Sequence, residues 1–382
     1  MTLRTDPDIA ASSPTPGAAV AIVLVNYRDA RDTLECLDSL LALQYPAFEI
    51  FVVDNDSRDD SLDELARWCE RPQRVASWQS LPGVGSHVLE ANAVAVAHRR
   101  IAAGHEAPAT PVLRGGVTLV ASEQNLGFAG GCNLGIVAAG GRFDYLWLLN
   151  TDTVVRRDAL SELIGRALAD PGTGLIGATV RYYDRPEQVQ ALAGAAVSAR
   201  GLVFERLGDR ETFPQGLPER TAVEKRLAFI LGASMLVSRA FCDGVGPMQE
   251  DYFLYFEEYD WALRGGDRWT LGWAPGAEVF HKGGGSSTRS SAHTFSMQLR
   301  YRNLVRFVAR FLPVRLAEVR RQMWGTLLRY LAQGRWRGIW VVGGTLRQFS
   351  SLVASARPGD PPTPTPLDAQ GRPKPVALDP GR

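Results

Sequence analysis

The 382-residue sequence lacks the features that mark several specialised classes of protein. It has no apolar run of the ~18 residues that a membrane-spanning helix requires, and residues 1–17 lack the apolar stretch of a secretory signal peptide. The four cysteines lie far apart, without a CxxC pair or a neighbouring histidine, so they predict no zinc site and indicate a reducing compartment. Apolar residues make up 45% of the chain, an ordinary value for a protein with a buried core. We therefore expect a cytoplasmic globular protein.

Acidic residues are scarce in one segment near the C-terminus. Residues 299–350 hold eleven arginines, no lysine and a single acid, Glu318, although the whole chain has a net charge of only +1. Trp324, Trp336 and Trp340 lie in the same segment. Arginine and tryptophan on a helical pattern are typical of contact with an anionic surface, either a membrane or a nucleic acid. The alternative is a solvated charged face opposite a face that packs on the core.

We expect the tails 1–17 and 357–382, the second of which is rich in proline, to be disordered. Between them, strand-like and helical patterns alternate. This alternation predicts an α/β fold with a mostly parallel sheet covered by helices. The expected strands are 20–25, 50–53, 117–121, 145–149 and 277–280, and the expected helices are 32–43, 61–69, 130–139 and 158–169.

Residues 70–116 interrupt the alternation. We interpret them as an insertion at the edge of the sheet, with a helix over 88–102. The expected organisation is a catalytic domain over 18–290, which contains this insertion, followed by a basic amphipathic helical region over 291–356.

Two of the expected strands end in acids: Asp54 in VVDNDS and Asp152 in LWLLNTDT. A carboxylate directly after a strand of a parallel sheet projects from the edge where such sheets bind ligands. Asp152 follows Asn150 by two residues, and this pair suits a hard cation that also holds phosphate oxygens. Either acid is equally typical of a turn or a helix N-cap.

The segment NLGFAGGCNLG, from Asn125 to Gly135, has the composition of a glycine-rich phosphate cradle without the G-x-G-x-x-G spacing. Glycines before a helix leave backbone N–H groups free for an anion, although tight packing explains them as well. His281 closes the strand-like segment 277–280 and precedes a glycine run. A histidine there is a candidate ligand for a metal or a phosphate, or a structural residue.

The segment YFLYFEEYDWALR places Glu257, Glu258 and Asp260 within four positions, next to aromatic residues. Carboxylates at this spacing raise one another's pKa and are costly unless they bind a cation or move a proton. Asp260 and Arg264 are spaced for an ion pair within a helix. We therefore assign the chemistry to the two glutamates.

Together these segments resemble glycosyltransferase family 2, the inverting nucleotide-sugar enzymes of GT-A fold, and within it the bacterial rhamnosyltransferase-like group. The resemblance runs in family order from about residue 20 to 290. Its blocks are AIVLVNYRDARDTLECLDSL, FVVDNDSRDDS, NLGFAGGCNLG, LLNTDTVV, GASMLVSRAFCDGVG, FLYFEEYDWALR and VFHKGGGSS.

On the donor side, the resemblance implies that Asn26 and Asp54 line the pocket of the nucleotide base. It implies that Asn125 and Asn133 help to hold the nucleotide. Asn150 stands where the family has the first acid of its D-x-D motif, and it is counted with the nucleotide-binding residues.

The resemblance also implies that Asp152 binds Mg²⁺ or Mn²⁺ on the donor diphosphate, and that His281 contacts the metal or the diphosphate. Gly232, Ala233 and Asp260 belong on the acceptor side.

The catalytic base of the family matches Glu258, a glutamate where the family has aspartate. Since the extra methylene changes the reach of the side chain, Glu257 stays open as the alternative base or as a supporting residue. The implied reaction is one in-line displacement, in which the carboxylate takes the acceptor proton and the anomeric configuration inverts.

The implied donor is dTDP-rhamnose or a UDP-sugar, and the acceptor is a hydroxyl of a cell-surface glycan or a lipid-linked glycan. We expect residues 299–350 to lie on the anionic inner face of the cytoplasmic membrane, with a helical cap or a homodimer contact as alternatives, and we expect no nucleic-acid partner. The competing hypothesis is a catalytically inactive glycan-binding or scaffold protein of the same fold.

Overall fold

The computed structural model describes residues 17–71, 81, 95–108, 114–197, 204–283 and 290–356. The strands are β1 (Val20–Asn26), β2 (Phe48–Asp54), β3 (His98–Ala102), β4 (Gly116–Ala121), β5 (Tyr145–Leu149), β6 (Thr153–Val155), β7 (Thr173–Tyr182), β8 (Val189–Leu192), β9 (Gly194–Val197), β10 (Phe204–Arg206), β11 (Phe229–Ile230), β12 (Ser234–Ser238) and β13 (Thr270–His281). The α-helices are α1 (Ala30–Leu41), α2 (Ser61–Glu70), α3 (Gly127–Ala139), α4 (Ala159–Ala169), α5 (Arg220–Glu224), α6 (Arg239–Val245), α7 (Glu257–Gly265), α8 (Ser290–Phe311), α9 (Leu316–Ala332), α10 (Trp336–Arg347) and α11 (Phe349–Ser355). Short 3₁₀ turns cover Gly140–Arg142, Glu250–Tyr252, Gly266–Arg268 and Pro313–Arg315.

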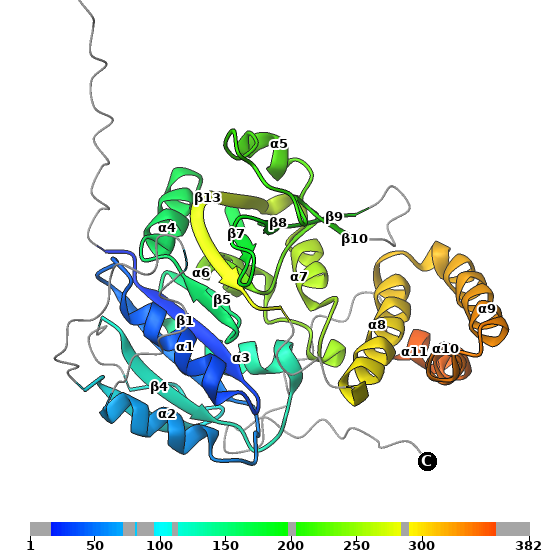
Figure 1. Ribbon diagram of the computed structural model, residues 1–382, viewed down its shortest axis with the longest axis horizontal. Coiled ribbons are helices and arrows are strands. Elements are labelled where there is room, and N and C mark those ends of the chain that lie inside the picture. Colours follow the sequence, from blue (N-terminus) through cyan, green and yellow to red (C-terminus); the bar gives the residue numbers. More distant parts are fainter. Residues whose placement is uncertain are drawn as a thin grey trace, which may run out of the picture.

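One twisted sheet organises the chain (Figure 1). Within the described residues its strand order is β3-β4-β2-β1-β5-β12-β7-β13-β6, with β8 paired to β7. The strands from β3 to β5 are all parallel, and the antiparallel β12 joins them to the parallel pair β7 and β13. The mixed α/β class with a mostly parallel sheet is therefore confirmed.

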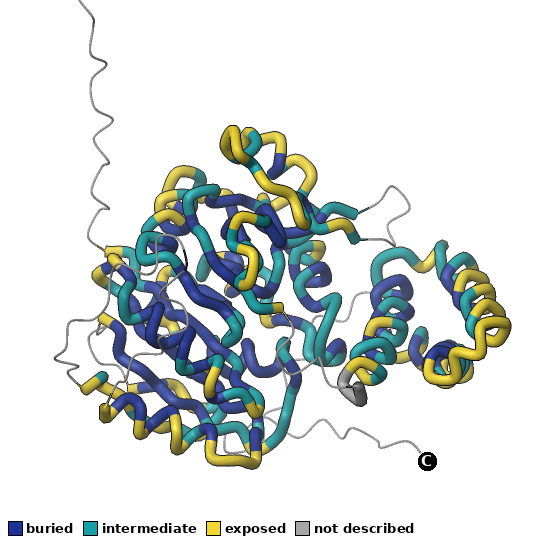
Figure 2. Tube along the Cα trace, viewed as in Figure 1, coloured by how far each residue is buried: buried dark blue, intermediate teal, exposed yellow. Residues whose placement is uncertain are grey.

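The helices cover both faces of the sheet because successive side chains of a strand point to opposite faces. On β1, Val20, Ile22 and Leu24 belong to the core shared with α1, α2 and α4. Ala21 and Val23 belong to the core shared with α3, α6 and α7. The strands run through the interior and the outer faces of the helices are exposed (Figure 2). With both faces covered, the ends of the strands remain as edges where a ligand can bind, and sheets of this kind bind ligands at the carboxyl ends.

Residues 98–102 differ from the expectation. They form the edge strand β3, parallel to β4, and not the end of a helix over 88–102. Arg99 of β3 pairs with Glu49 of β2 across β4 at 3.3 Å, so alternate side chains of this segment reach back to the sheet. Residues 88–94 and both expected tails, except Gly17, lie outside the described residues.

Helices α8 to α11 form a group of their own next to α7 (Figure 1). Their apolar core includes Phe307 of α8 and Met323 of α9, and it continues to α7 and the 3₁₀ turn before it through Tyr259 and Tyr252. In the described part of the chain, no helix combines the length and apolarity needed to cross a bilayer.

Candidate active site

A cavity of about 860 Å³ opens at the carboxyl edge of the sheet. Eight of the residues singled out from the sequence line it: Asn125, Asn150, Asp152, Gly232, Ala233, Glu257, Glu258 and His281. The other four, which are Asn26, Asp54, Asn133 and Asp260, do not line it. The volume and the mixture of aromatic and polar walls are typical of a small-molecule site.

Asn26 and Asp54 lie behind the wall of the cavity. They are register partners at the ends of β1 and β2, and the Asn26 amide donates to Asp54 at 2.8 Å. Ser57 donates to Asp54 at 2.5 Å. All three side chains are buried, so the group fixes the loop after β2. The residue of this loop that does line the cavity is Asn55, which the sequence analysis did not single out.

The glycine-rich segment brings a helix close to the sheet. A Cβ on Gly131 would lie 2.6 Å from the side chain of Val25, and one on Gly135 would lie 2.3 Å from that of Val23. These two glycines therefore serve tight helix–strand packing, the alternative noted for this segment. Gly127, at the start of α3, lines the cavity and has a φ of 71°.

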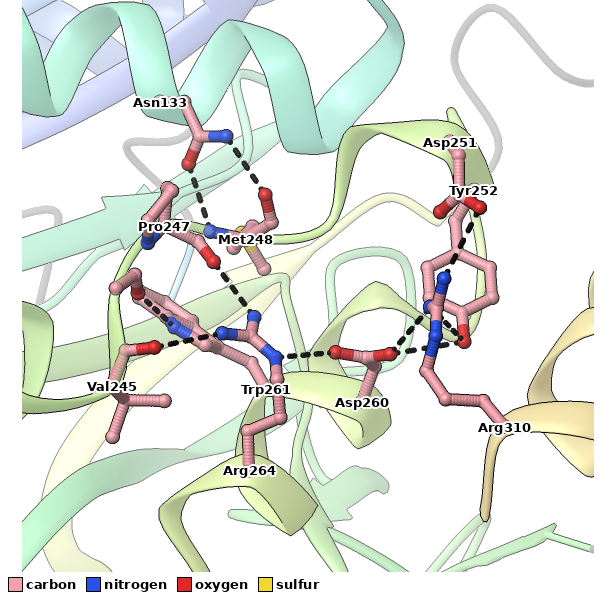
Figure 3. Close-up of polar contacts among 11 residues, drawn as sticks. Asn133, Val245, Pro247, Met248, Asp251, Tyr252, Asp260, Trp261, Arg264 and Arg310 are labelled. Atoms are coloured by element: carbon pink, nitrogen blue, oxygen red, sulfur yellow. Dashed lines mark hydrogen bonds and ion pairs between the residues drawn. The ribbon is translucent and has the colours of Figure 1, made fainter. Parts of the chain in front are cut away.

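Asn133 bonds to protein groups outside the cavity wall. Its amide donates to the carbonyl of Met248 at 2.9 Å, and its Oδ1 accepts the Met248 N–H at 3.0 Å (Figure 3). The same amide donates to Glu250 at 2.8 Å. Asn133 thus holds the chain before the 3₁₀ turn at Glu250 and does not line the cavity.

Asp152 and His281 form the polar end of the cavity. The Nε2 atom of His281 lies 3.1 Å from Asp152 Oδ1 and 3.3 Å from the Asn150 amide nitrogen. Nδ1 lies 2.6 Å from Gln190 Oε1, and a proton on Nδ1 would leave the Nε2 lone pair directed at Asp152. An imidazole lone pair facing a carboxylate oxygen is a donor set for a divalent cation. The family resemblance did not identify Gln190, which lies on β8 and which only the fold brings beside His281.

The protein offers few other metal ligands here. No cluster of three or more His, Cys, Asp or Glu side chains suited to a metal ion occurs among the described residues. A cation bound by Asp152 and His281 would need further oxygens, and diphosphate oxygens commonly complete the shell of Mg²⁺ in this way. The donor set therefore fits a metal held jointly by the protein and a diphosphate.

The two glutamates begin α7, directly after a stretch of unusual backbone. Phe253, Tyr255 and Phe256 have φ values of 64°, 73° and 80°, in the left-handed region that non-glycine residues avoid. Such strain concentrates at functional sites and persists only where the surroundings enforce it. A Cβ on Gly232 would lie 2.5 Å from Glu258 Oε1, so this position leaves room for the carboxylate.

The carboxyl groups of Glu257 and Glu258 have different surroundings. Glu257 is 1% exposed, and within the described residues its oxygens have no hydrogen-bond partner of ordinary geometry. Burial and then the charge of Glu258 raise the pKa of Glu257 well above its usual range. Burial also raises the pKa of Glu258, but backbone N–H groups, including that of Gly232, and the charge of Arg300 oppose the rise. Glu258 is accordingly the more readily ionised of the pair.

Asp260 is part of a buried ionic network and not of the cavity wall (Figure 3). One of its oxygens accepts from Arg264 at 2.6 Å, which confirms the helical ion pair expected from the sequence. Its other oxygen accepts from Tyr252 at 3.0 Å and from Arg310 of α8 at 2.9 Å. The carboxylate is fully buried, so it links α7 to α8.

Comparison with known proteins places these observations in a family. A family model described as Glycosyltransferase like family 2 matches residues 16–303, about three quarters of the chain. No curated protein sequence matches the chain.

Among solved structures, the mannosyltransferase PcManGT from Pyrobaculum calidifontis, in complex with GDP-Man and Mn²⁺, is 15% identical with a TM-score of 0.48; the match covers 92% of this chain and 89% of that one. TarS residues 1–349 from S. aureus are 12% identical with a TM-score of 0.45, and 89% of each chain is covered. GalNAc-T7, with UDP, GalNAc and Mn²⁺, is 15% identical with a TM-score of 0.49; 76% of this chain and 47% of that one are covered. At these values the likeness says nothing about the substrate of this chain.

Proposed function

This chain belongs to glycosyltransferase-like family 2, and we propose that it is an inverting enzyme that moves a sugar from a nucleotide-diphosphate donor to an acceptor hydroxyl. The observation that carries the proposal is that Asp152, His281 and Glu258 line one cavity. A site for the diphosphate and a carboxylate base therefore open on the same space. An inactive scaffold would have no need to bury a second carboxyl group, Glu257, beside the first.

Glu258 is the base in this proposal. The carboxylate takes the proton of the acceptor hydroxyl as the oxygen attacks the anomeric carbon, and the bond from that carbon to the nucleoside diphosphate breaks. A single displacement inverts the configuration. A pKa raised by burial makes Glu258 a stronger base, while Arg300 and the backbone N–H groups limit the rise of that pKa. Glu257, whose pKa is raised further, remains protonated beside it.

Asp152 and His281 would hold a divalent cation, Mg²⁺ or Mn²⁺, together with the donor diphosphate. Once bound, the cation would neutralise the charge of the departing diphosphate. Gln190 orients the imidazole through Nδ1, and Asn150 lies beside Nε2. Asn55 and Asn125 line the neighbouring wall and bond to one another at 3.0 Å, and we assign them to the nucleotide.

The donor is dTDP-rhamnose or a UDP-sugar, and the acceptor is a glycan or lipid-linked glycan. The first experiment is a thermal-shift panel of UDP, dTDP, GDP, ADP and CDP, each with and without Mn²⁺. Because a bound ligand stabilises the fold by mass action, one nucleotide should stand out, and only with the metal. No shift with any nucleotide would contradict the proposed donor site.

The second experiment separates the two glutamates. Glu258→Gln should lower turnover of the donor that the panel identifies by ~10²-fold or more, with nucleotide affinity unchanged, since a general base contributes 10²–10⁴-fold. Glu257→Gln, the matched control, should retain most of the activity. If Glu257→Gln is the inactive variant, the assignment of the base is wrong.

We also assign the exposed surface of α9 and α10 to an anionic lipid surface. Trp324, Trp336 and Trp340 are 47%, 76% and 63% exposed, and exposed arginines such as Arg321 and Arg337 accompany them. Tryptophan and arginine together are typical of a helix that lies in the headgroup region. Part of the segment 299–350 has another role: Arg306 and Arg310 of α8 face the catalytic side.

Sedimentation with vesicles tests this surface. The protein should bind phosphatidylcholine vesicles that contain phosphatidylglycerol, bind pure phosphatidylcholine weakly, and lose binding at high salt. The triple variant W324A/W336A/W340A should lose most of the binding. If the protein sediments with neither kind of vesicle and elutes as a dimer in size-exclusion chromatography, the lipid assignment is overturned in favour of a dimer contact.

A further inference from the structure

Three residues in the four before α7 have left-handed backbone, although none is glycine. They are Phe253, Tyr255 and Phe256. A non-glycine residue in this region costs of order 1–2 kcal/mol, so three of them within four positions require strong support from their surroundings. Glu257 and Glu258 follow directly, so this turn decides where their carboxyl groups lie.

One buried side chain of α8 supplies much of that support. The amide nitrogen of Asn303 lies 2.8 Å from the Tyr252 carbonyl, 2.8 Å from that of Leu254 and 3.0 Å from that of Tyr255. Asn303 is fully buried. Only the NH₂ end of the amide can face three carbonyl oxygens, so its orientation is fixed. Its three acceptors span the left-handed turn.

The same face of α8 continues this contact. Arg306 donates to the Asp251 carbonyl at 2.7 Å, and Arg310 donates to Asp260 of α7 at 2.9 Å. Positions 303, 306 and 310 follow the spacing of one helical face. Between them, the ring of Phe307 stacks on Tyr259 of α7 with centroids 4.5 Å apart. This face of α8 therefore contacts both the left-handed turn and α7, which carries the two glutamates.

A second element holds the turn from the other side. The N–H of Phe128, in the first turn of α3, donates to the Phe253 carbonyl at 2.7 Å. Gly127 permits this approach, since a Cβ there would lie 2.1 Å from the Phe253 oxygen. With α3 on one side and α8 on the other, the turn has little freedom to relax.

We propose that Asn303 is a positioning residue for glycosyl transfer: by holding the carbonyls of the turn, it sets the place of the Glu258 carboxylate in the cavity. The proposal rests on the proposed function, because Glu258 is taken as the base. It gives α8 a part in the reaction that its basic sequence does not indicate.

A double-mutant cycle between Asn303 and Glu258 tests the proposal in the full-length protein. Asn303→Ala should lower kcat by ~10²-fold, the effect of a misplacement of about 1 Å, while the Kd of UDP or dTDP with Mn²⁺ stays within threefold. In the E258Q background the same substitution should cost less than threefold, because the group it places is already gone. Turnover is followed as nucleoside diphosphate released from dTDP-rhamnose or UDP-glucose.

Thr345→Val is the matched control. Thr345 is buried in α10 and donates to the Val341 carbonyl within that helix, away from the turn. The Thr345→Val substitution should leave kcat unchanged. If Asn303→Ala does not fold, Asn303→Ser replaces it, since the shorter hydroxyl makes at most one of the three bonds.

Two results would overturn the positioning role of Asn303 but leave Glu258 as the base. One is a wild-type kcat in a folded Asn303 variant. The other is an equal loss of kcat from Asn303→Ala in the wild-type and E258Q backgrounds when E258Q itself is impaired, which a purely structural role would give. Wild-type turnover by E258Q is a different result: it would overturn Glu258 as the base, and the positioning role of Asn303 with it.

Discussion

The two ends of the cavity are built in different ways. At the end that we propose for the donor, called here the donor end, Asp152 directly precedes β6 and His281 ends β13, and the ladder between these strands places His281 opposite Thr153. At the end of the proposed base, called here the base end, Glu258 follows a left-handed turn that no strand or helix contains. The first arrangement comes with the sheet, whereas the second depends on contacts from α3 and α8.

This difference shows where the site is rigid by construction and where it needs support. Ladder hydrogen bonds hold the strand ends as part of the fold itself. Buried hydrogen bonds from Asn303 and Phe128 stabilise the left-handed backbone of the turn. Substitutions at the donor end should therefore act through lost ligands, and those at the base end through altered placement and ionisation.

The largest effect is expected at the donor end. Asp152→Ala should abolish the metal-dependent thermal shift given by UDP or dTDP. In the wild type, this shift corresponds to a stabilisation of the folded state by about 2.7 kcal/mol at a ligand concentration of 100 Kd. Asp158→Ala is the control, because Asp158 pairs with Arg156 outside the cavity. A full metal-dependent shift in the Asp152 variant would break the comparison, since the donor end would then not depend on its strand-end carboxylate.

A smaller effect is expected on the ionisation of the base. The charge of Arg300 lowers the pKa of Glu258 against burial, so Arg300→Met should raise that pKa. Since the base must be ionised, the acid limb of the kcat–pH profile should move to higher pH. The charged and titratable groups about Glu258 include Glu257 on its own helix, Arg300 on α8 and Cys132 on α3.

Arg320→Met, an exposed change on α9, is the control for this profile and should leave the acid limb in place. An acid limb that does not move in Arg300→Met would indicate that a group other than Glu258 controls the reaction.

The smallest effect is expected on stability. Folding raises the pKa of Glu257, so above the ordinary glutamate pKa of about 4.3 the folded state keeps a proton that the unfolded state has lost. Stability from this group therefore falls as pH rises from that value toward the raised pKa. Glu257→Gln removes this dependence. Its free energy of unfolding in urea, relative to that of the wild type, should therefore be higher at pH 8 than at pH 5, by about 1 kcal/mol. An equal difference at both pH values would contradict a buried, protonated Glu257.

Much of the sheet was predictable because its signals are local. The apolar strands 20–25, 50–53, 117–121 and 145–149 match β1, β2, β4 and β5, because buried parallel strands appear as short apolar runs. The edge strand β3 was missed. Its exposure alternates along HRRIA, and its side chains are mostly polar, so nothing local separates it from a helix end.

The sequence predicted which residues gather at the cavity better than it predicted their contacts. Eight of the twelve candidate residues line the cavity, and Asp152 and His281 lie 3.1 Å apart, whereas Asn26, Asp54 and Asn133 bond to protein groups behind the wall. An asparagine that holds a carbonyl and one that holds a nucleotide look alike in a sequence. The partner of each amide lies on another segment, close in the sequence for Asn26 and Asp54 but 115 positions away for Asn133 and Met248.

By itself, the sequence determined the α/β class, the acids at the strand ends and the pair of glutamates, since each depends on the pattern of neighbouring residues. Only the tertiary structure decided how differently burial and neighbouring charges shift the pKa values of the two glutamates, and which carbonyls Asn303 of α8 holds. Burial, the approach of Arg300 and the three bonds of Asn303 arise from packing between distant elements. The physical reason is that charge states and backbone strain depend on the surroundings that the fold assembles, whereas periodicity depends on the chain alone.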